Sequence, residues 1–392
     1  MAVHTHSPQG TSGAAGTAVK TRGAILREPG TRSGWLVEDI LIDPPKAGEV
    51  LIKLAASGMC HSDDHVNTGD IPLDWGPIIG GHEGAGVIQE VGPGVERLKP
   101  GDHVITTFLP SCGHCRFCVT GESNLCDTSA GVLAGTAPDG THRVHLTDGT
   151  PVGPFSYLGT FSPYLCAPAL SIIKIDEDIP LKTAALIGCG VPTGWGSAVY
   201  AADTQIGDTV VVIGTGGVGM KAVQGARHAG AEQIVAVDPV EWKRQAAIDT
   251  FGATHSAASV QEALELVMTI THGVGADRGV ITMGVGDGKI LNDAQMLVRK
   301  GGVLVFTSAA PLLDMDVTLN LYTFAMSNKR LQGTLYGSVN PRVDVPRLLN
   351  LYRRGELKLD ELISRTYTLD EINQGWKDLE EGRNLRGVIL FD

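Results

Sequence analysis

The stretch Thr209–Asp238, TVVVIGTGGVGMKAVQGARHAGAEQIVAVD, contains the parts of one complete βαβ unit. Its apolar run TVVVI predicts a buried strand, MKAVQGARHAG predicts a helix, and QIVAVD predicts a second strand parallel to the first. Gly214, Gly216 and Gly219 form the pattern G-x-G-x-x-G between the first strand and the helix. A strand, a glycine-rich turn and a helix in this order predict a doubly wound, nucleotide-binding fold.

The glycine pattern predicts where a dinucleotide binds. Gly214 permits a tight turn, Gly216 lets the backbone approach a pyrophosphate at the helix N-terminus, and Gly219 lets the helix pack closely on the strand. Gly217 lies within the same turn and is assigned to the same site. A glycine-rich turn without a ligand is the alternative, but the complete strand–helix–strand unit favours a dinucleotide.

Asp238, at the end of the second strand, indicates which dinucleotide this is. Its carboxylate would accept hydrogen bonds from the adenosine ribose and repel a 2′-phosphate, which favours NAD over NADP. Lys243, one helical turn further, is placed to reach the same ribose. Two alternatives stay open: Asp238 merely caps a helix, or Arg244 accommodates a 2′-phosphate and reverses the preference.

Sequence patterns on either side of this unit predict an α/β protein of two domains. Alternating strands and helices occupy residues 192–332, as expected for a doubly wound parallel sheet. Residues 22–191 are rich in short β-type runs bounded by Gly and Pro, and we expect them to form a second domain with residues 333–392. Residues 1–21 are rich in Gly, Ala, Ser and Thr, which predicts a disordered leader.

The composition excludes several classes of protein. With 392 residues the chain is long enough for two domains, and 43% hydrophobic with 19% charged residues is ordinary for a globular protein. The formal net charge of −12 argues against an extended surface for nucleic acid or an anionic membrane. No apolar run approaches the roughly 20 residues that span a bilayer, and no export signal is visible, so we expect a cytoplasmic protein.

Four cysteines lie close together in SCGHCRFCVTGESNLC, residues 111–126. The spacing C-x2-C-x2-C-x7-C lets all four thiols turn inward around one ion, and four thiolates suit a closed, structural zinc site. Few apolar residues intervene, so we expect the lobe 108–127 to depend on metal for folding. Disulfides would need an oxidising compartment, and no cysteine here is followed by the proline that ends a short-spaced iron–sulfur motif. The predicted ligands are Cys112, Cys115, Cys118 and Cys126.

A second group of metal-binding residue types is scattered along the chain. Cys60 begins CHSDDH, His82 and Glu83 lie in GGHEGAG, and Cys189 lies in IGCGVPTGWG, shortly before the nucleotide unit. Two thiolates and an imidazole would form a Cys2His zinc site, which leaves a fourth position open for a reactant. The sequence alone does not bring these residues together, and each one separately also fits a buried core position.

The chain resembles the zinc-dependent alcohol dehydrogenases of the medium-chain dehydrogenase/reductase family in motifs that occur in one order: CHSDDH, GGHEGAGVIQEVGPGV, the four-cysteine lobe, IGCGVPTGWGSAVY and VVIGTGGVG. The resemblance covers roughly residues 22–392. It implies a GroES-like, mostly-β catalytic domain beside a Rossmann domain, with two zinc ions and NAD. It also implies reversible oxidation of a small alcohol to an aldehyde or ketone by hydride transfer.

The resemblance assigns roles to individual residues. It implies that Cys60, His82 and Cys189 bind the catalytic zinc, that Glu83 approaches the metal during ligand exchange, and that Asp63 orients the ring of His82. Further matching positions are Thr193 and Val218 at the nicotinamide ring and Arg386 at the pyrophosphate.

The same resemblance implies a path for the alcohol proton after zinc has lowered the pKa of the alcohol. Ser62 is implied to take the proton and pass it through the nicotinamide ribose to His65, a residue type with an ordinary pKa of about 6.5. The simpler interpretations are a loop or helix-cap hydroxyl for Ser62 and a surface histidine for His65. His61 stands where many relatives have a basic residue on the cofactor phosphate, and Cys166 matches no ligand position.

The implied substrate pocket is apolar. Phe108 matches an aromatic wall position, and Tyr157 with Leu158 matches another part of the wall, although all three equally fit core residues. Such walls favour an apolar alcohol or aldehyde. The segments VDPVEWK and SCGHCRFC resemble more narrowly a bacterial subgroup that holds its nicotinamide tightly and uses an external electron acceptor to reoxidise it in place.

Two other functions stay open. A thiol-dependent formaldehyde dehydrogenase, acting on an S-hydroxymethyl thiol, would share both zinc sites but would need a basic pocket residue that the sequence does not identify. A non-catalytic zinc- and nucleotide-binding protein would be expected to lose catalytic ligands, whereas Cys60, His82, Glu83 and Cys189 are all present. The resemblance also implies a homo-oligomer, a dimer or tetramer, with residues 328–337 as the candidate contact region.

Overall fold

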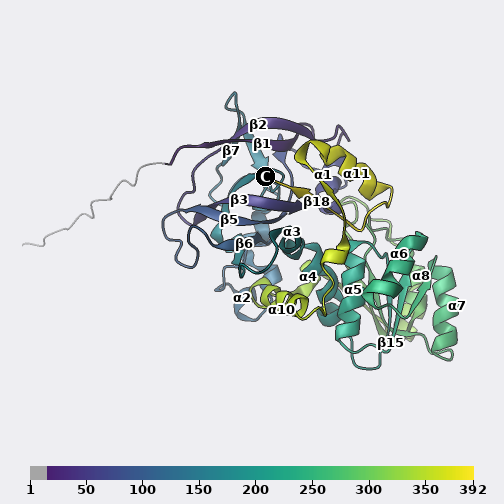
Figure 1. Ribbon diagram of the computed structural model, residues 1–392. Coiled ribbons are helices and arrows are strands. Elements are labelled where there is room, and N and C mark those ends of the chain that lie inside the picture. The colour runs from purple at the N-terminus through teal and green to yellow at the C-terminus, as the bar shows by residue number, and fades with distance from the viewer. Residues whose placement is uncertain (1–15) are drawn as a thin grey trace, which may run out of the picture.

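The computed structural model describes residues 16–392, which form a β-rich domain and a nucleotide-type α/β domain (Figure 1). Most of the predicted leader lies outside the described residues. The predicted boundary at residue 21 is wrong by three residues, because strand β1 (Val19–Leu26) already pairs antiparallel with β2 (Leu36–Ile42) at Val19.

The β-rich domain contains a closed barrel and a mixed sheet. The barrel has the order β1-β2-β7-β8-β4, and the mixed sheet has the order β10-β6-β5-β3-β18-β17, with β9 paired to β3. The C-terminal strand β18 pairs antiparallel with β3, which returns the end of the chain to this domain. The other barrel strands are β4 (Ile78–Ile79), β7 (Val144–Leu146) and β8 (Pro151–Pro154). The mixed sheet consists of β3 (Glu49–Gly58), β5 (Glu83–Val91), β6 (His103–Thr106), β9 (Tyr164–Pro168), β10 (Ile172–Lys174), β17 (Ile363–Tyr367) and β18 (Arg386–Leu390).

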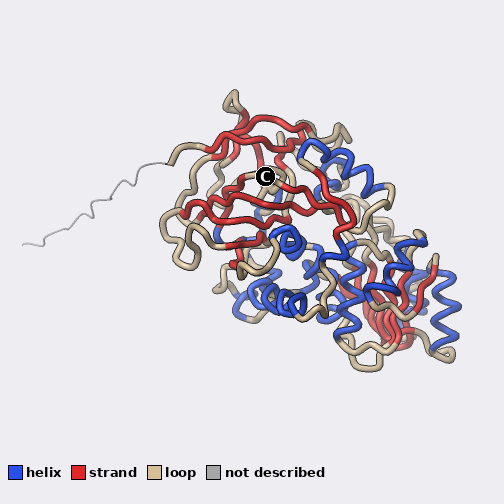
Figure 2. The backbone as a smooth tube through the Cα atoms, viewed as in Figure 1, coloured by secondary structure: helices blue, strands red, loops and turns tan. Residues whose placement is uncertain are grey.

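The nucleotide domain is built on a six-stranded parallel sheet with the order β13-β12-β11-β14-β15-β16. This is the Rossmann order 3-2-1-4-5-6, so the predicted doubly wound sheet is confirmed. Helices cover both faces of the sheet (Figure 2), which explains why every residue of β11 is buried. The strands are β11 (Thr209–Ile213), β12 (Gln233–Val237), β13 (His255–Ala257), β14 (Ala276–Ile281), β15 (Val298–Phe306) and β16 (Arg330–Gly333).

The helices fall into two groups. Helix α1 follows β3 and begins directly after Cys60, while α2 lies inside the cysteine lobe. The helices outside the nucleotide sheet are α1 (His61–Thr68), α2 (Arg116–Val119), α3 (Leu181–Ala184), α10 (Pro341–Arg353) and α11 (Ile372–Glu380). Those that connect or precede the parallel strands are α4 (Gly190–Gly196), α5 (Gly217–His228), α6 (Glu241–Ala246), α7 (Val260–Ile270), α8 (Ile290–Leu297) and α9 (Leu321–Met326).

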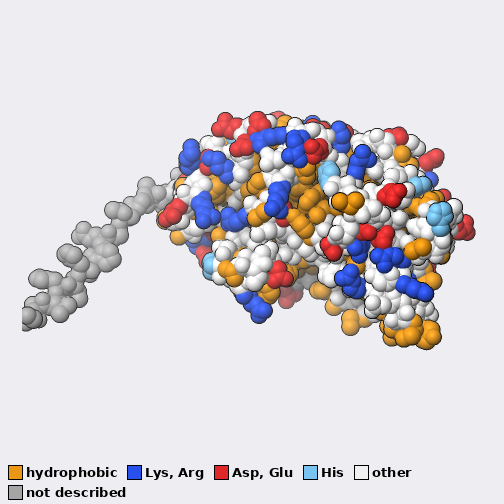
Figure 3. All heavy atoms as spheres, turned by 90° about the horizontal axis from the view of Figure 1, so that it is seen from below, with side chains coloured by type: hydrophobic (Ala, Val, Ile, Leu, Met, Phe, Trp, Pro, Cys, Tyr) orange, Lys and Arg blue, Asp and Glu red, His pale blue; other side chains and the backbone are white. Residues whose placement is uncertain are grey.

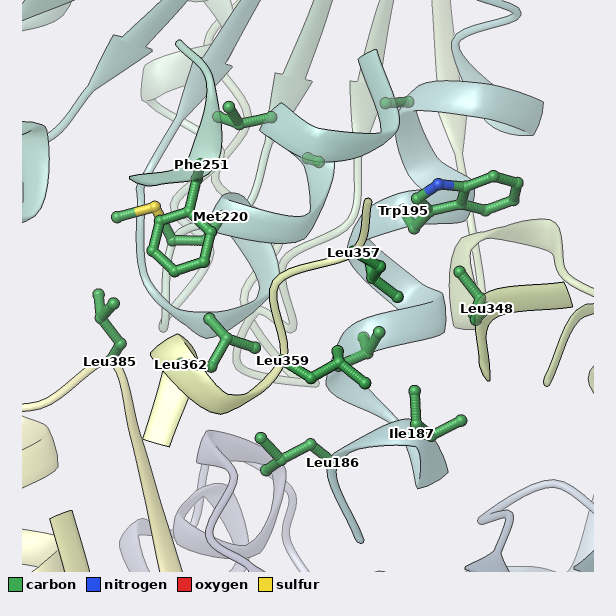
Figure 4. Close-up of a cluster of buried hydrophobic side chains, with 14 of the residues drawn as sticks. Leu186, Ile187, Trp195, Met220, Phe251, Leu348, Leu357, Leu359, Leu362 and Leu385 are labelled. Carbon is green, nitrogen blue, oxygen red and sulfur yellow. The ribbon is translucent and has the colours of Figure 1, made fainter. Parts of the chain in front are cut away.

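One hydrophobic core is continuous between the two domains (Figure 4). Leu186 and Ile187 precede the nucleotide domain, Met220 lies on α5, and Leu359 and Leu385 belong to the returning C-terminal part, yet all five are buried in one cluster. Packing at this density fixes the relative position of the elements that supply it. The loops between the domains are therefore held in a defined arrangement.

Charged side chains of both signs are interspersed over the face shown in Figure 3. Within residues 16–392, none of the helices combines the length and the apolar character that crossing a bilayer requires.

Candidate active site

Four metal-binding side chains converge where the two domains meet. Cys60 caps the N-terminus of α1, His82 and Glu83 stand at the start of β5, and Cys189 lies immediately before α4. One ligand atom from each residue lies within 4.8 Å of all the others. His82, Glu83 and Cys189 are buried. The structure thus brings together residues that are up to 129 positions apart, from Cys60 to Cys189.

The donor atoms of this cluster fit zinc. Nδ1 of His82 lies 3.1 Å from the buried carboxylate of Asp63, which also accepts a hydrogen bond from the Gly81 amide at 2.8 Å. An acceptor-only carboxylate places the proton on Nδ1 and leaves Nε2 with its lone pair. Nε2 is buried and has no hydrogen-bond partner among the described residues. A bare imidazole nitrogen beside two thiols matches a Cys2His zinc site.

One of the two thiols is prepared for metal binding. The neighbouring thiol of Cys189 lowers the pKa of Cys60 well below its usual value and the nearby His82 adds to this effect, although burial opposes it, while the pKa of Cys189 is raised in turn. The thiolate is the form of cysteine that binds metal. Cys60 is therefore poised to act as an anionic ligand.

Glu83 forms a buried ion pair with Arg386. The guanidinium Nη2 of Arg386 donates to Oε2 of Glu83, and Oε1 accepts a hydrogen bond from the Gly190 amide at 2.9 Å. Both charged side chains are almost fully buried. A Cβ atom at Gly217 would lie 2.1 Å from Cδ of Arg386, so this arginine crosses directly over the glycine-rich turn. Arg386 thus connects the predicted cofactor site to the predicted metal site, a link that the sequence did not predict.

The glycine-rich turn has the geometry that a dinucleotide requires. Gly214 has φ +90°, and a Cβ at Gly219 would lie 1.8 Å from the Gly214 carbonyl oxygen, so both positions need glycine. In contrast, no atom lies within 4 Å of the Cβ position at Gly216, the N-cap of α5. Open space before a helix N-terminus fits an approaching pyrophosphate. Thr215 Oγ1 and Arg386 Nε are buried without partners in the described structure, which leaves polar atoms for such a ligand.

Asp238 follows β12 at the end of this turn. Its Oδ2 accepts a hydrogen bond from Thr215 N at 2.9 Å, and its Oδ1 accepts one from Val240 N at 2.9 Å. Arg244 donates to the carbonyl oxygen of Asp238 at 2.8 Å, which occupies part of its guanidinium. Lys243 is partly buried, and burial lowers its pKa although Asp238 raises it. The arrangement fits a site for an unphosphorylated ribose.

Thr193 and Val218 lie where α4 crosses α5. Thr193 Oγ1 donates to the carbonyl oxygen of Cys189 at 2.8 Å, and a Cβ at Gly194 would lie 1.9 Å from the Val218 carbonyl oxygen. The close crossing thus packs the segment that follows Cys189 against the glycine-rich turn at Val218.

The two residues of the predicted proton path lie on α1. Ser62 Oγ is 3.7 Å from Cys60 Sγ, and His65 is buried with its Nδ1 2.8 Å from Asp70 Oδ2. His65 is therefore not a surface histidine. The ring of His61 lies against Gly284 of the nucleotide domain, and burial lowers its pKa to about 4.

Two aromatic rings pack against the ring of His82. The ring of Phe108 is 5.8 Å from that of His82, and Phe155 is 5.5 Å from it. Tyr336 packs on Phe108 with centroids 4.7 Å apart and donates to the Gly188 carbonyl oxygen at 2.6 Å. Sequence reasoning missed Phe155 and Tyr336. An aromatic residue two positions before Tyr157 was the available signal for Phe155, whereas Tyr336 has no motif of its own.

The other predicted wall residues lie deeper. Leu158 is buried in the core cluster of the mixed sheet with Val50 and Ile52. Tyr157 is also buried, and its hydroxyl oxygen lies 2.2 Å from the position that a Cβ at Gly131 would take. Both residues support the region of the predicted pocket. The contacts of Tyr157 and Leu158 do not place either side chain at the surface of that pocket.

The four cysteines of the lobe also converge. Their sulfur atoms lie within 4.8 Å of one another. Backbone amides donate to them, from Cys112 to Cys126 Sγ and from Cys115 to Cys112 Sγ, each at 3.3 Å. Hydrogen bonds from the His114 amide and then the Cys115 amide lower the pKa of Cys112 to about 6, against a smaller effect of burial. Burial instead raises the pKa of Cys126 to about 11. Four sulfur atoms gathered in this way, with backbone amides directed at them, fit a structural zinc ion.

Two thiolate-rich sites, one closed and one open, beside a Rossmann turn define a zinc-dependent dehydrogenase that uses a nicotinamide dinucleotide. Two protein families match the chain: the alcohol dehydrogenase GroES-like domain over residues 46–177 and the zinc-binding dehydrogenase over residues 217–354. The chain belongs to the zinc-dependent alcohol dehydrogenases of the medium-chain dehydrogenase/reductase family, and it oxidises alcohols reversibly with zinc and NAD as cofactors.

Similar proteins support this assignment over most of the chain. The NDMA-dependent alcohol dehydrogenase of Amycolatopsis methanolica is 48% identical, with 95% of this chain and 99% of the relative covered. The S-(hydroxymethyl)glutathione dehydrogenase of Paracoccus denitrificans is 37% identical, with 95% and 100% covered. The crystal structure of benzyl alcohol dehydrogenase from Acinetobacter calcoaceticus is 29% identical with a TM-score of 0.87, over 95% of this chain and 100% of that chain. The alcohol dehydrogenase function predicted from the sequence is confirmed over the thiol-dependent alternative.

Proposed function

We propose that this enzyme keeps its NAD bound throughout turnover and passes the electrons to an external acceptor, as an NDMA-dependent dehydrogenase. The observation that carries the proposal is the 48% identity to an enzyme of that name. The relative with 37% identity bears a different name, that of an S-(hydroxymethyl)glutathione dehydrogenase.

Contacts across the cofactor cleft support a captive cofactor. The loop 307–320 of the nucleotide domain reaches the catalytic domain, where Leu312 N donates to the Asp70 carbonyl oxygen at 2.7 Å. His61 lies against Gly284 from the other side of the same boundary. Each contact would have to break before the cleft opens, and we expect this to slow the release of a dinucleotide.

We propose that Cys60, His82 and Cys189 hold the catalytic zinc, with Glu83 beside it. Bound there, zinc supplies a Lewis acid that lowers the pKa of an alcohol, while NAD supplies the hydride acceptor. Asp63 keeps the lone pair of His82 directed at the metal. The structural site is assigned to the four cysteines of the lobe.

The remaining roles belong to side chains around this centre. Ser62 and His65 remove the alcohol proton, and Thr193 with Val218 supports the nicotinamide. The turn Gly214–Gly219, with Arg386 above it, holds the pyrophosphate. The rings of Phe108, Phe155 and Tyr336 exclude water, which favours an apolar alcohol or aldehyde. Asp238 and Lys243 bind the adenosine ribose.

The first test is the nicotinamide content of the desalted protein after acid release. About one NAD(H) per chain, with alcohol oxidation that needs an added acceptor and no added NAD, supports the proposal. A negligible content with full activity on added NAD contradicts it. Arg386→Met is expected to lower the retained nicotinamide, while Arg353→Met, an exposed arginine paired with Asp178, is the matched control.

We further propose a cytoplasmic homo-oligomer formed through β16. All four residues of this edge strand are exposed. Large apolar side chains of the neighbouring segment are exposed as well, including Met315 at 88% and Tyr322 at 77%. Exposed strand edges and apolar patches of this kind are typical of subunit contacts. Light scattering at working concentration tests this, and a monomer mass contradicts it.

A further inference from the structure

We propose that Asp70 is the positioning residue of His65, which holds the ring in the tautomer that accepts the proton and stabilises the imidazolium that forms. This inference rests on the role of His65 in the proposed proton path. It adds a partner to that path: the proton enters the ring at Nε2 while Nδ1–H stays hydrogen-bonded to the carboxylate of Asp70.

The chain reversal at the end of α1 brings Asp70 back toward His65. Gly69 adopts φ +86°, a conformation that favours glycine, and its amide donates to the His65 carbonyl oxygen at 3.1 Å. The amide of Ile71 donates to the same oxygen at 3.0 Å. The carboxylate of Asp70 is held between these two anchored residues.

Two hydrogen bonds fix the carboxylate on the ring. Asp70 Oδ2 accepts from His65 Nδ1 at 2.8 Å and from Thr68 Oγ1 at 2.8 Å. Burial alone would raise the pKa of Asp70, but the bonds from His65 and Thr68 outweigh it and lower the pKa below the usual value. An ionised carboxylate only accepts hydrogen bonds, so Nδ1 carries the proton of the neutral ring.

The other ring nitrogen is left available. His65 Nε2 is buried and has no hydrogen-bond partner among residues 16–392. With the proton on Nδ1, Nε2 has a free lone pair and accepts a proton from the active site. An unpaired buried acceptor is costly unless a ligand or a proton satisfies it.

The pair spans the boundary between interior and solvent. The side chain of His65 is 3% exposed and that of Asp70 is 22% exposed. When Nε2 binds the proton, the ring becomes an imidazolium whose positive charge lies beside the ionised carboxylate of Asp70. The imidazolium then releases one proton to water, no electrons are transferred, and the neutral Nδ1–H tautomer is restored.

Other charged groups near His65 do not replace Asp70. Asp64, on the same helix, accepts a hydrogen bond from Asn67 at 3.3 Å. His61 lies against Gly284. Arg32, in the preceding loop, is close enough for its charge to oppose the effect of burial on the pKa of both Asp64 and Asp70. Within the described residues, Asp70 is the side chain that hydrogen-bonds the ring of His65. Asp64→Asn is therefore a matched control for Asp70→Asn.

The experiment compares Asp70→Asn, Asp64→Asn, His65→Gln and the double variant His65→Gln/Asp70→Asn as zinc-loaded holoenzymes. We measure kcat and KM for alcohol oxidation from pH 5 to 10, and we record ¹⁵N spectra that report the tautomer of His65. General acid–base groups contribute about 10²–10⁴-fold, so we expect kcat of Asp70→Asn to fall by roughly tenfold while KM is unchanged. The pH profile of kcat should change as well, because the negative charge beside the ring is removed.

The outcomes separate this inference from the proton path itself. The inference is supported if Asp70→Asn loses the Nδ1–H tautomer of His65 while Asp64→Asn keeps it. The double variant should then be no slower than His65→Gln. Full activity of His65→Gln would overturn the proposed path and the inference with it. If His65→Gln is slow but Asp70→Asn keeps both the tautomer of His65 and the pH profile of the natural enzyme, the inference alone is overturned.

Discussion

Two aspartates fix the two histidines of the active site, and both act from the α1 region. Asp63 holds Nδ1 of His82 at 3.1 Å, and Asp70 holds Nδ1 of His65 at 2.8 Å. In each case the carboxylate leaves Nε2 without a partner in the described structure. The tautomer proposed to bind metal at His82 and the tautomer proposed to accept a proton at His65 are thus set by the same kind of hydrogen bond.

Asp63→Asn is expected to weaken the catalytic zinc site. The amide cannot hold the Nδ1–H tautomer as firmly as a carboxylate, and loss of such a partner typically lowers metal affinity by about 10–100-fold. Zinc content during titration with a chelator measures the effect, which should be confined to one of the two ions. Asp64→Asn changes the neighbouring acid, which bonds Asn67, and should leave both ions in place. Equal zinc retention in the two variants would contradict the assignment.

The buried pair Glu83–Arg386 is expected to be strongly coupled. Arg386→Met leaves Glu83 as a buried charge without its partner, which costs about 3–5 kcal/mol. The double variant Glu83→Leu/Arg386→Met removes both charges and should recover much of this loss. Urea unfolding of the four proteins in the cycle measures the coupling. The exposed pair Arg353–Asp178 provides the comparison, and its removal should cost less than about 1 kcal/mol.

At the scale of elements, the cysteine lobe is tied to the aromatic residues around His82. Asn124 of the lobe donates to the Leu335 carbonyl oxygen at 3.1 Å, and Arg342 of α10 donates to the Ser111 carbonyl oxygen at 2.9 Å. Tyr336, next to Leu335, packs on Phe108 beside the metal cluster. The lobe therefore supports the aromatic wall in addition to its own fold.

Cys118→Ser is expected to remove the structural zinc and loosen this wall. Because the lobe has few apolar residues, losing one of four ligands should abolish protection of its amides from hydrogen exchange. We expect one zinc per chain to remain and kcat to fall several-fold as the Leu335–Tyr336 segment loses its anchor. Cys166→Ser, a buried thiol outside both metal groups, should keep two zinc ions. A lobe that stays protected without its metal would refute this account.

The elements that the sequence predicted well are those in which several signals agree. The run TVVVI, the glycine turn and Asp238 predicted β11, α5 and β12 together, because strand burial, turn geometry and helix start are all local properties. The prediction placed the end of the leader too late. Val19 already belongs to a strand, and it pairs with Ile42, which lies 23 residues further along the chain.

The spacing of the four lobe cysteines predicted their clustering, whereas the grouping of Cys60, His82 and Cys189 followed from the family resemblance and not from their spacing. Tyr336 was not predicted, since its contact with Phe108 depends on a chain return over more than 200 residues. Asp70 is close to His65 in sequence, yet an acid five residues after a histidine carries no signal by itself. Only the left-handed turn at Gly69 brings the two side chains together.

At the scale of the whole molecule, a buried lysine lies in the seam between the domains. Lys221 of α5 is fully buried, and its ammonium donates to Gln224 Oε1 at 2.7 Å and to the carbonyl oxygen of Lys358 in the C-terminal part. Burial lowers its pKa well below the usual value, with only a small opposing effect of Glu361. The packing between α5 and the C-terminal part therefore contains a group that prefers to be neutral.

The pH dependence of stability should reveal this lysine. Its pKa is lowered in the folded state, so the unfolded chain binds more protons in the range between the lowered pKa and about 10.5. The contribution of Lys221 to the free energy of unfolding is therefore lost at low pH. It increases as the pH rises toward 10.5, by up to about 1.4 kcal/mol per pH unit. Lys221→Met removes the contribution, so the free energy of unfolding of the natural protein should rise with pH relative to this variant.

Urea unfolding of zinc-loaded protein from pH 7 to 10 measures the difference between the two slopes. Lys182→Met, an exposed lysine on α3, should follow the natural protein at every pH. Parallel curves for the natural protein and Lys221→Met would show that Lys221 stays charged in the folded state. The Gln224 and Lys358 oxygens would then stabilise an ammonium ion inside the seam, and Lys221→Met should weaken domain closure and the retention of NAD.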